Sequence, residues 1–141
     1  MTLRWLPHTA DIRVELTGSS LADLLGQASG AVRELLVGQS VVRPQAVRLL
    51  SVSGLDDTEL VFAFLRALLD LYYRDQFVPG DAEVSELTYS GEGVRASATI
   101  RGELFDAARH EAQPEVKAVT RHGLRVARTD AGWLADVVFD V

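Results

Sequence analysis

The stretch EVSELTYSGEGVRASATIRG, residues 83–102, holds two runs of alternating apolar and polar residues on either side of the glycine-containing turn SGEG. Alternation with a period of two residues is typical of a strand with one buried face. In the second run, Val94, Ala96, Ala98 and Ile100 share one face. Two such runs joined by a short turn predict an antiparallel β-hairpin.

Strand patterns also lie on both sides of this hairpin. Toward the C-terminus, residues 116–129 (VKAVTRHGLRVART) lead through the turn TDAG into a closing strand at 133–140, whose apolar residues alternate with polar ones. Toward the N-terminus, residues 46–54 (AVRLLSVSG) follow Pro44 and end in a glycine-containing turn. Residues 10–18 (ADIRVELTG) show the same alternation. Each of these segments is predicted to be a strand.

Two segments have the three-and-four spacing of apolar residues that predicts a helix. In residues 19–38, Ser20 is a suitable N-cap and Gly38 a suitable stop. The second helix is expected from Asp57 to Arg74, and it is apolar on nearly all sides, so we expect it to be the more buried of the two. The chain is therefore expected to form one α+β domain over residues 1–141, with two main helices packed on a largely antiparallel sheet.

The composition limits the classes of function. Hydrophobic residues make up 48% and charged residues 24% of the chain, so it should fold throughout. The absence of cysteine excludes disulfides, thiol nucleophiles and cysteine-bound metals. The net charge of −6, with its 14 Lys and Arg residues scattered, argues against direct binding to nucleic acid. Neither a signal peptide nor an unbroken apolar span is visible, so we expect a cytoplasmic protein without membrane contact.

Negative charge gathers at the end of the chain. Asp140 stands beside the α-carboxylate of Val141, and two charges about 4 Å apart at an effective dielectric near 20 repel by about 4 kcal/mol. A bound cation would relieve that repulsion, and oxygen ligands select a hard ion such as Ca²⁺ or Mg²⁺. If the first and last strands are neighbours, Asp11 joins the same group. The alternative is a frayed terminus with a solvated carboxylate and no function.

Three further side chains are candidates for contacts outside the chain. His8, just before the first strand, either caps a turn or binds a metal. In residues 115–123, strand alternation places Lys117 with Val119 on one face, and Val116 with His122 on the other. Lys117 is either an ordinary exposed lysine or a charge directed at an anionic partner. We find no phosphate-binding loop and no nucleophile motif, so catalysis by this chain alone is not expected.

Three motifs in a fixed order resemble one known family. They are HTADI at 8–12, EVKAVTRHGL at 115–124, and ADVVFDV at 135–141. Together they are similar to the archease family, small proteins that act as partners of the RtcB-type RNA-splicing ligase. One departure is Arg121, which stands where the family often has an aromatic residue.

The resemblance implies a fold, a metal site and a partner. The implied fold is an Hsp33-like α+β type, and the implied metal ligands are Asp11, Asp140 and the terminal Val141. Calcium is the expected ion, with magnesium or manganese as alternatives. The side chains expected to face the ligase are His8, Lys117 and His122.

The implied role is to speed guanylylation of the ligase, in which a ligase histidine takes GMP from GTP with metal help. This step permits repeated rounds of tRNA exon joining or RNA repair, and all the covalent chemistry belongs to the ligase. One alternative is a metal-dependent hydrolase or nuclease that uses the same carboxylates to activate water. A general chaperone is another, but it would favour a sizeable exposed apolar patch, whereas the apolar residues are accounted for by predicted core faces.

Overall fold

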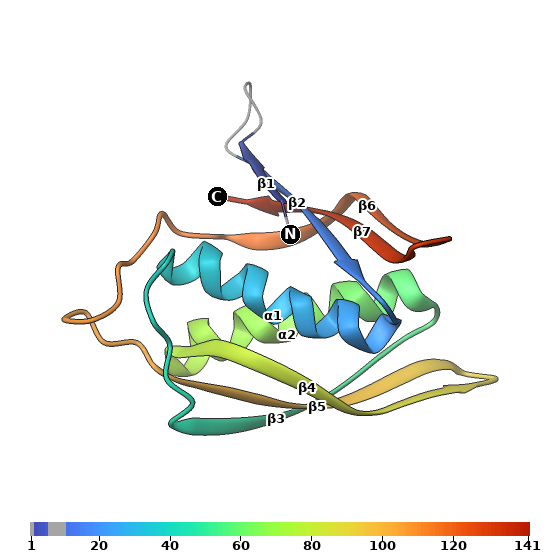
Figure 1. Ribbon diagram of the computed structural model, residues 1–141, viewed down its shortest axis with the longest axis horizontal. Coiled ribbons are helices and arrows are strands. Elements are labelled where there is room, and N and C mark those ends of the chain that lie inside the picture. Colours follow the sequence, from blue (N-terminus) through green and yellow to red (C-terminus); the bar gives the residue numbers. More distant parts are fainter. Residues whose placement is uncertain (1, 6–10) are drawn as a thin grey trace.

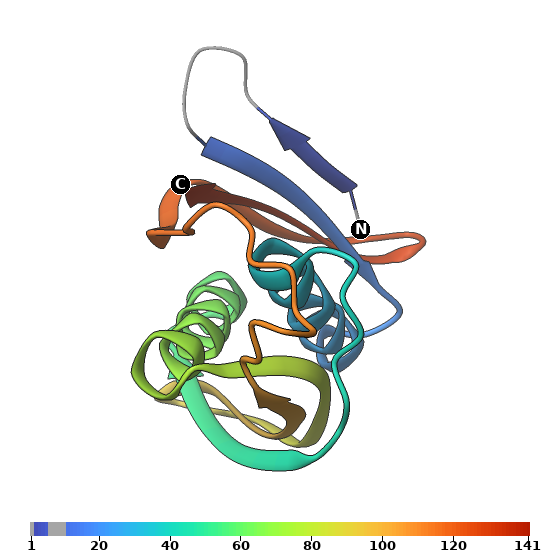
Figure 2. The ribbon, with the colours of Figure 1, turned by 90° about the vertical axis from the view of Figure 1, so that its left-hand side faces the viewer.

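The computed structural model describes residues 2–5 and 11–141. Within these residues the chain forms two helices and seven strands. The helices lie side by side as a middle layer between two antiparallel sheets (Figure 1), and the same three layers are visible from the side in Figure 2. The α+β class with two main helices is confirmed. Strand periodicity could not show that the strands divide between two sheets.

The first sheet brings together strands from both ends of the chain. Its order is β1 (Thr2–Trp5), β2 (Asp11–Gly18), β7 (Gly132–Asp140) and β6 (Ala118–Thr129), with every neighbouring pair antiparallel. The strand predicted at the N-terminus is therefore paired directly with the closing strand. Asp11 was expected to join Asp140 only if these two strands were neighbours, and this condition is confirmed.

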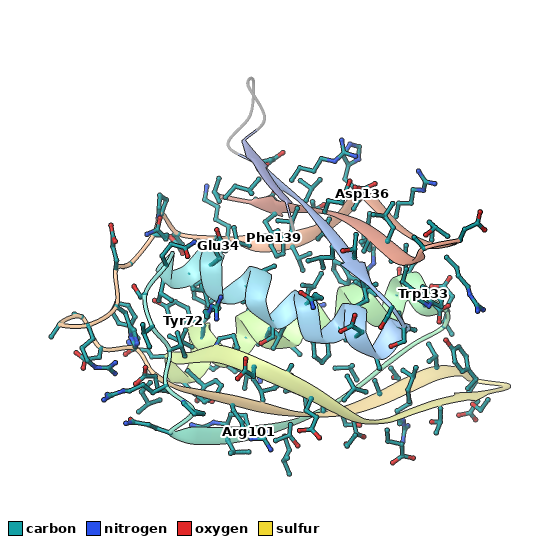
Figure 3. The ribbon with its side chains drawn as sticks, viewed as in Figure 1. Glu34, Tyr72, Arg101, Trp133, Asp136 and Phe139 are labelled. Carbon is teal, nitrogen blue, oxygen red and sulfur yellow. The ribbon has the colours of Figure 1, made fainter. Side chains whose placement is uncertain are left out.

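The two central strands of this sheet bury one face against the helices. On β2 the buried residues are Ile12, Val14 and Leu16, and on β7 they include Val137 and Phe139. Figure 3 shows Phe139 pointing into the layer below the sheet, whereas Asp136 lies on the outer side. The face assignment predicted from alternation is confirmed for both strands.

The second sheet has the order β3 (Ala46–Gly54), β5 (Gly93–Leu104), β4 (Phe77–Ser90). The predicted β4–β5 hairpin is confirmed, but β4 begins at Phe77, six residues before the alternation becomes visible at Glu83. Every residue of the segment 77–80 is buried and it includes Pro79, so it shows no period of two. Buried strand segments of this kind cannot be recognised by alternation.

Both helices start and end close to the predicted positions. The first, α1 (Leu21–Val37), is capped by Ser20, whose hydroxyl accepts a hydrogen bond from the Asp23 N–H at 3.0 Å. Gly38 ends it with a left-handed φ of 60°, a conformation that favours glycine. The second, α2 (Asp57–Asp75), is capped by the Asp56 carboxylate.

The expectation that α2 is the more buried helix is wrong. Ten residues of α1 are buried and seven of α2. The last two turns of α2 carry Tyr72, which is half-buried, and Tyr73, which is exposed. In the described part of the chain, neither helix combines the length and the apolar character needed to cross a membrane.

Two segments without regular structure, residues 38–45 and 105–117, connect the layers and meet at a buried carboxylate. Glu103, 3% exposed, accepts hydrogen bonds from the Arg43 N–H at 2.8 Å and from the Arg109 guanidinium. His110 Nδ1 accepts from the Asp106 N–H at 2.9 Å, so the proton of the neutral ring is on Nε2, which donates to Glu103 at 3.0 Å. We refer to these residues as the Glu103 cluster.

Hydrogen bonds determine the charge state of Glu103. Burial would raise the pKa of this carboxyl, but the hydrogen bonds from Arg109, the Arg43 N–H and His110 outweigh that effect and lower it to about 2. The group is therefore ionised at neutral pH. It holds both connecting segments against the end of β5.

Candidate functional site

The register of the first sheet places Asp11 directly opposite Asp140. Asp11 is the first residue of β2 and Asp140 the last residue of β7, so both lie at the same end of the sheet. Directly opposed residues of an antiparallel pair hold their Cβ atoms about 4.5–5.5 Å apart. The two carboxyl groups are therefore neighbours on adjacent strands.

The two carboxyl groups share a hydrogen bond, and this changes the acidity of Asp140. The hydrogen bond with Asp11, burial and the negative charge of Asp11 raise the pKa of Asp140, while the positive charge of Lys117 lowers it. The nearby Asp11 carboxyl therefore disfavours the ionised form of Asp140, as expected for two neighbouring carboxylates that repel each other. A cation placed there would relieve the same repulsion.

Asp136, four residues before Asp140 on β7, has a different environment. It lies on the same face as Asp140, but it forms an ion pair with Arg13 at 3.5 Å. Its charge is therefore matched within the sheet. Asp136 also lies opposite a carboxylate, Glu15 of β2, but it lies opposite Arg125 of β6 as well, so it has two arginines beside it.

Val141 follows Asp140 directly, is half-buried, and packs against the hydrophobic core. This packing differs from the frayed end considered as the alternative. The packing of its side chain keeps Val141, whose α-carboxylate is the third expected ligand, in a fixed place after Asp140.

The backbone of Lys117 is joined to the same end of β7. Its N–H donates to the carbonyl of Asp140 at 2.7 Å, and the hydroxyl of Tyr73 on α2 donates to the carbonyl of Val116. These two hydrogen bonds use the two ends of one peptide unit, between Val116 and Lys117. The Lys117 side chain itself is exposed. Tyr73 was not singled out from the sequence, because nothing local indicates that α2 lies beside residue 116.

A pocket of about 280 Å³ opens beside this peptide, between α2 and the start of β6. Phe62 and Tyr73 contribute aromatic surface to it, and Arg66, Asp70 and Lys117 contribute charges. Arg66 and Asp70, one turn apart on α2, therefore border a concave surface that Lys117 also lines.

Replacing Tyr73 with phenylalanine is expected to loosen this peptide without disturbing the fold. Loss of one hydrogen bond at a partly exposed site should lower the free energy of unfolding by about 1 kcal/mol or less. The Lys117 N–H should then exchange faster with solvent in hydrogen-exchange NMR. Tyr89→Phe, which removes a comparable hydroxyl bond to Asp57 at the other end of α2, is the matched control. Unchanged exchange at Lys117 in Tyr73→Phe would contradict the assignment.

The alternation predicted for residues 115–123 does not hold in the structure. Strand β6 begins only at Ala118, and Val116 and Val119 are both buried, although they were predicted on opposite faces. The register shifts between Thr120, opposite Val138, and Arg125, opposite Asp136, so β6 contains three extra residues there. His122 lies within this irregular stretch and is exposed.

The three side chains expected to face a partner therefore do not form one group in the described structure. Lys117 lies next to the aspartate pair, and His122 lies farther along β6, beyond Thr120. His8 falls outside the residues that the structure describes. That these three side chains face a partner protein stays a prediction.

Arg121 has a structural role that the sequence did not indicate. Its guanidinium pairs with Glu59 at 3.2 Å and lies 4.0 Å from the centre of the Phe62 ring, both on α2. An arginine over an aromatic face gains a cation–π attraction. Arg121 thus fastens β6 to α2, a contact that depends on tertiary packing.

The donors present suit a hard divalent ion better than zinc or another transition metal. In residues 11–141 no three His, Cys, Asp or Glu side chains gather closely enough to hold a metal. The site offers two side-chain carboxylates and the α-carboxylate of Val141, all oxygen donors. Calcium and magnesium prefer oxygen ligands and complete their shells with water. The donor types are therefore those that such an ion prefers, and its binding here stays a prediction.

Comparison with known proteins matches the whole chain to one family. The model of the Archease protein family matches residues 4–141. A "Protein archease" of Archaeoglobus fulgidus is 35% identical over 141 residues, covering 100% of both chains. One from Methanopyrus kandleri is 33% identical and covers 96% of both chains.

Solved structures with the same fold are also found. The solution structure of Methanobacterium thermoautotrophicum protein 1598 matches with a TM-score of 0.82 at 25% identity, over 96% of both chains. A Thermotoga maritima crystal structure described as "an archease, possible chaperone" matches with a TM-score of 0.63 at 22% identity, covering 100% of this chain and 98% of that one. The second likeness concerns the fold alone.

Proposed function

The chain belongs to the archease family, and from this premise we propose that it activates an RtcB-type RNA ligase without catalysing a reaction itself. It would speed the transfer of GMP from GTP to a histidine of the ligase, so that one ligase molecule completes many rounds of RNA joining. The observation that carries the proposal is the opposition of Asp11 and Asp140 at one end of the sheet. We propose that this pair is the site of a divalent ion.

Each part of the candidate site has a role in this proposal. Asp11, Asp140 and the α-carboxylate of Val141 would hold the ion, expected to be calcium, with magnesium or manganese as alternatives. Such an ion supplies positive charge that can orient and neutralise phosphate oxygens. The Lys117 N–H keeps the backbone of Asp140 in place, and the exposed Lys117 ammonium is available to an anionic group of the partner.

The overall charge supports docking on a protein surface. A net charge of −6 disfavours contact with the phosphates of RNA, whereas a protein partner requires only local complementarity. The ligase would therefore bind the RNA, and this chain would bind the ligase.

The test is the rate at which the ligase takes up labelled GMP from GTP in the presence of a divalent metal, with this chain at less than one molecule per ligase. We expect faster labelling, and labelled ligase in excess of the chain added, because an activator is released after each event. An unchanged rate would contradict the proposal. Hydrolysis of RNA or nucleotide by the isolated chain with Mg²⁺ or Mn²⁺ would support the metal-dependent hydrolase instead.

A further inference from the structure

Four of the large apolar side chains that are exposed lie on β3 or close to it along the chain. They are Val41, Val47, Leu49 and Leu55, exposed by 73%, 50%, 79% and 84%. Val47 and Leu49 lie on the outer face of β3, and the other two flank its ends. The assignment of all apolar residues to core faces is wrong for this group. A contiguous exposed apolar surface often marks a site of association.

The same strand is an edge of its sheet. In the order β3-β5-β4, one side of β3 has no neighbouring strand among residues 2–5 and 11–141, so alternate backbone groups point away from β5. Arg48 Nη1 donates to the Val47 carbonyl at 3.0 Å, the kind of bond expected for a carbonyl on the open side, and we infer this orientation for Val47. By antiparallel geometry, the backbone groups of Leu49, Ser51 and Ser53 point the same way.

The two edges of this sheet differ in how they are protected against pairing. The opposite edge, β4, contains Pro79, two register irregularities, and the exposed acidic residues Asp81, Glu83 and Glu86. Prolines, bulges and charges of this kind prevent an edge strand from pairing with another chain. The nine residues of β3 have an uninterrupted register, contain no proline, and include a single charge, Arg48.

We propose that β3 pairs antiparallel with β3 of a second copy of this chain, about a two-fold axis at Leu50. In this register Val47 lies opposite Ser53 of the second copy, and Leu49 lies opposite Ser51. All four outward-pointing residues then find backbone partners, and the two three-stranded sheets join into one sheet. Val47 and Leu49 then gain cross-strand neighbours, Ser53 and Ser51 of the second copy, on the same face of the joined sheet. The contact is isologous, as in most dimers.

The charges along β3 are complementary in this arrangement. An antiparallel pair places the segment before β3 in one copy beside the segment after β3 in the other. Arg43, which remains half-exposed despite its bonds to Glu103, then approaches Asp56 and Asp57 of the second copy. Arg48 faces Val52, so no like charges are directly opposed. Opposite charges at both ends of the strand favour this register over parallel pairing.

The dimer leaves the aspartate pair accessible. Figure 2 shows β3 in the sheet on the far side of the helices from β2 and β7. This inference goes beyond the proposed function, and its failure would leave the guanylylation result unaffected.

Sedimentation equilibrium of the full chain tests the proposal. We expect dimers to form with rising concentration up to about 1 mM, where even an association of about 4 kcal/mol would be visible. Leu49→Lys should give monomers, because it places two like charges diagonally across the new strand pair, and lysine on an edge strand opposes pairing. Ser85→Lys, which adds the same charge on the other edge strand, should leave the dimer intact. A monomeric wild-type chain throughout this range would overturn the proposal.

Cysteine pairs test the register, since the chain has no cysteine of its own. Under oxidation the double variant Leu49→Cys/Ser51→Cys should form covalent dimers, because opposed residues lie within the 4.4–6.8 Å Cα separation that a disulfide requires. Leu49→Cys alone should stay monomeric on a denaturing gel, since its two copies would be diagonal and more than about 7 Å apart. Cross-linking of the single variant, or none in the double variant, would overturn the register.

Discussion

Glu103→Ala is expected to lower the free energy of unfolding by about 3 kcal/mol, the largest stability effect of any change considered for this chain. The reason is the set of donors that converge on the buried carboxylate. Without it, the Arg43 N–H and His110 Nε2 lose their acceptor, and the Arg109 guanidinium loses its buried partner. Urea unfolding followed by circular dichroism measures the loss.

An exposed ion pair in the same sheet provides the control. Glu83 contacts Arg101 at 3.3 Å, and both side chains are exposed, so Glu83→Ala should cost less than about 1 kcal/mol. Similar losses for the two variants would show that the Glu103 cluster is no more important than a surface contact.

The pH dependence of stability gives an independent check of the same cluster. The pKa of Glu103 is about 2 in the folded chain, below the ordinary value of 4.5. The unfolded chain therefore binds the proton more readily, and this contribution to stability is complete above pH 4.5 and is lost as the pH falls toward 2. Glu103→Gln keeps the shape but cannot titrate. It should be less stable at neutral pH and lose stability less steeply over that interval.

Asp11→Asn and Asp140→Asn are each expected to reduce the stimulation of ligase guanylylation by about tenfold or more. Changes around metal ligands commonly cost 10–100-fold in metal affinity or activity, and loss of a ligand should cost at least as much. Both variants should remain folded, because an amide at either position can donate a hydrogen bond to the remaining carboxylate. The labelling rate of the ligase, together with Ca²⁺ binding by calorimetry, measures the effect.

Asp130→Asn is the matched control for these two variants. Asp130 is exposed in the turn between β6 and β7, at the opposite end of the strand that carries Asp140. The same change in charge on the same sheet should leave guanylylation unaltered. Full stimulation by both site variants would refute the role of the carboxylate pair, and equal loss in Asp130→Asn would assign the effect to net charge.

Local patterns predicted those parts of the fold that local physics determines. The N-cap at Ser20, the stop at Gly38 and the inward face of β7 all depend on neighbouring residues, and all are confirmed. The division into two sheets, the extra residues after Thr120 and the open edge at β3 depend on which distant segments meet. A single sequence contains no direct signal for such meetings.

In the candidate site, too, some residues were predicted from the sequence and others could not be. Asp11 and Asp140 were linked on the condition that their strands are neighbours, and the register shows that they are. The hydroxyl of Tyr73 and the guanidinium of Arg121 could not be placed, because each acts across the gap between α2 and the start of β6. The metal and the ligase remain predictions that the proposed experiments address.

The position of β7 in the middle of the first sheet affects how the protein is made. Strand β2 is synthesised before both helices and the whole second sheet, but its partner β7 follows all of them in the chain. Until then β2 and β6 have no strand between them, so the nascent chain can complete its second sheet but not its first. Pairing over such a sequence separation is slow to form. The aspartate pair is therefore assembled only once β7 has been synthesised, and a chain cut before β7 would lack it.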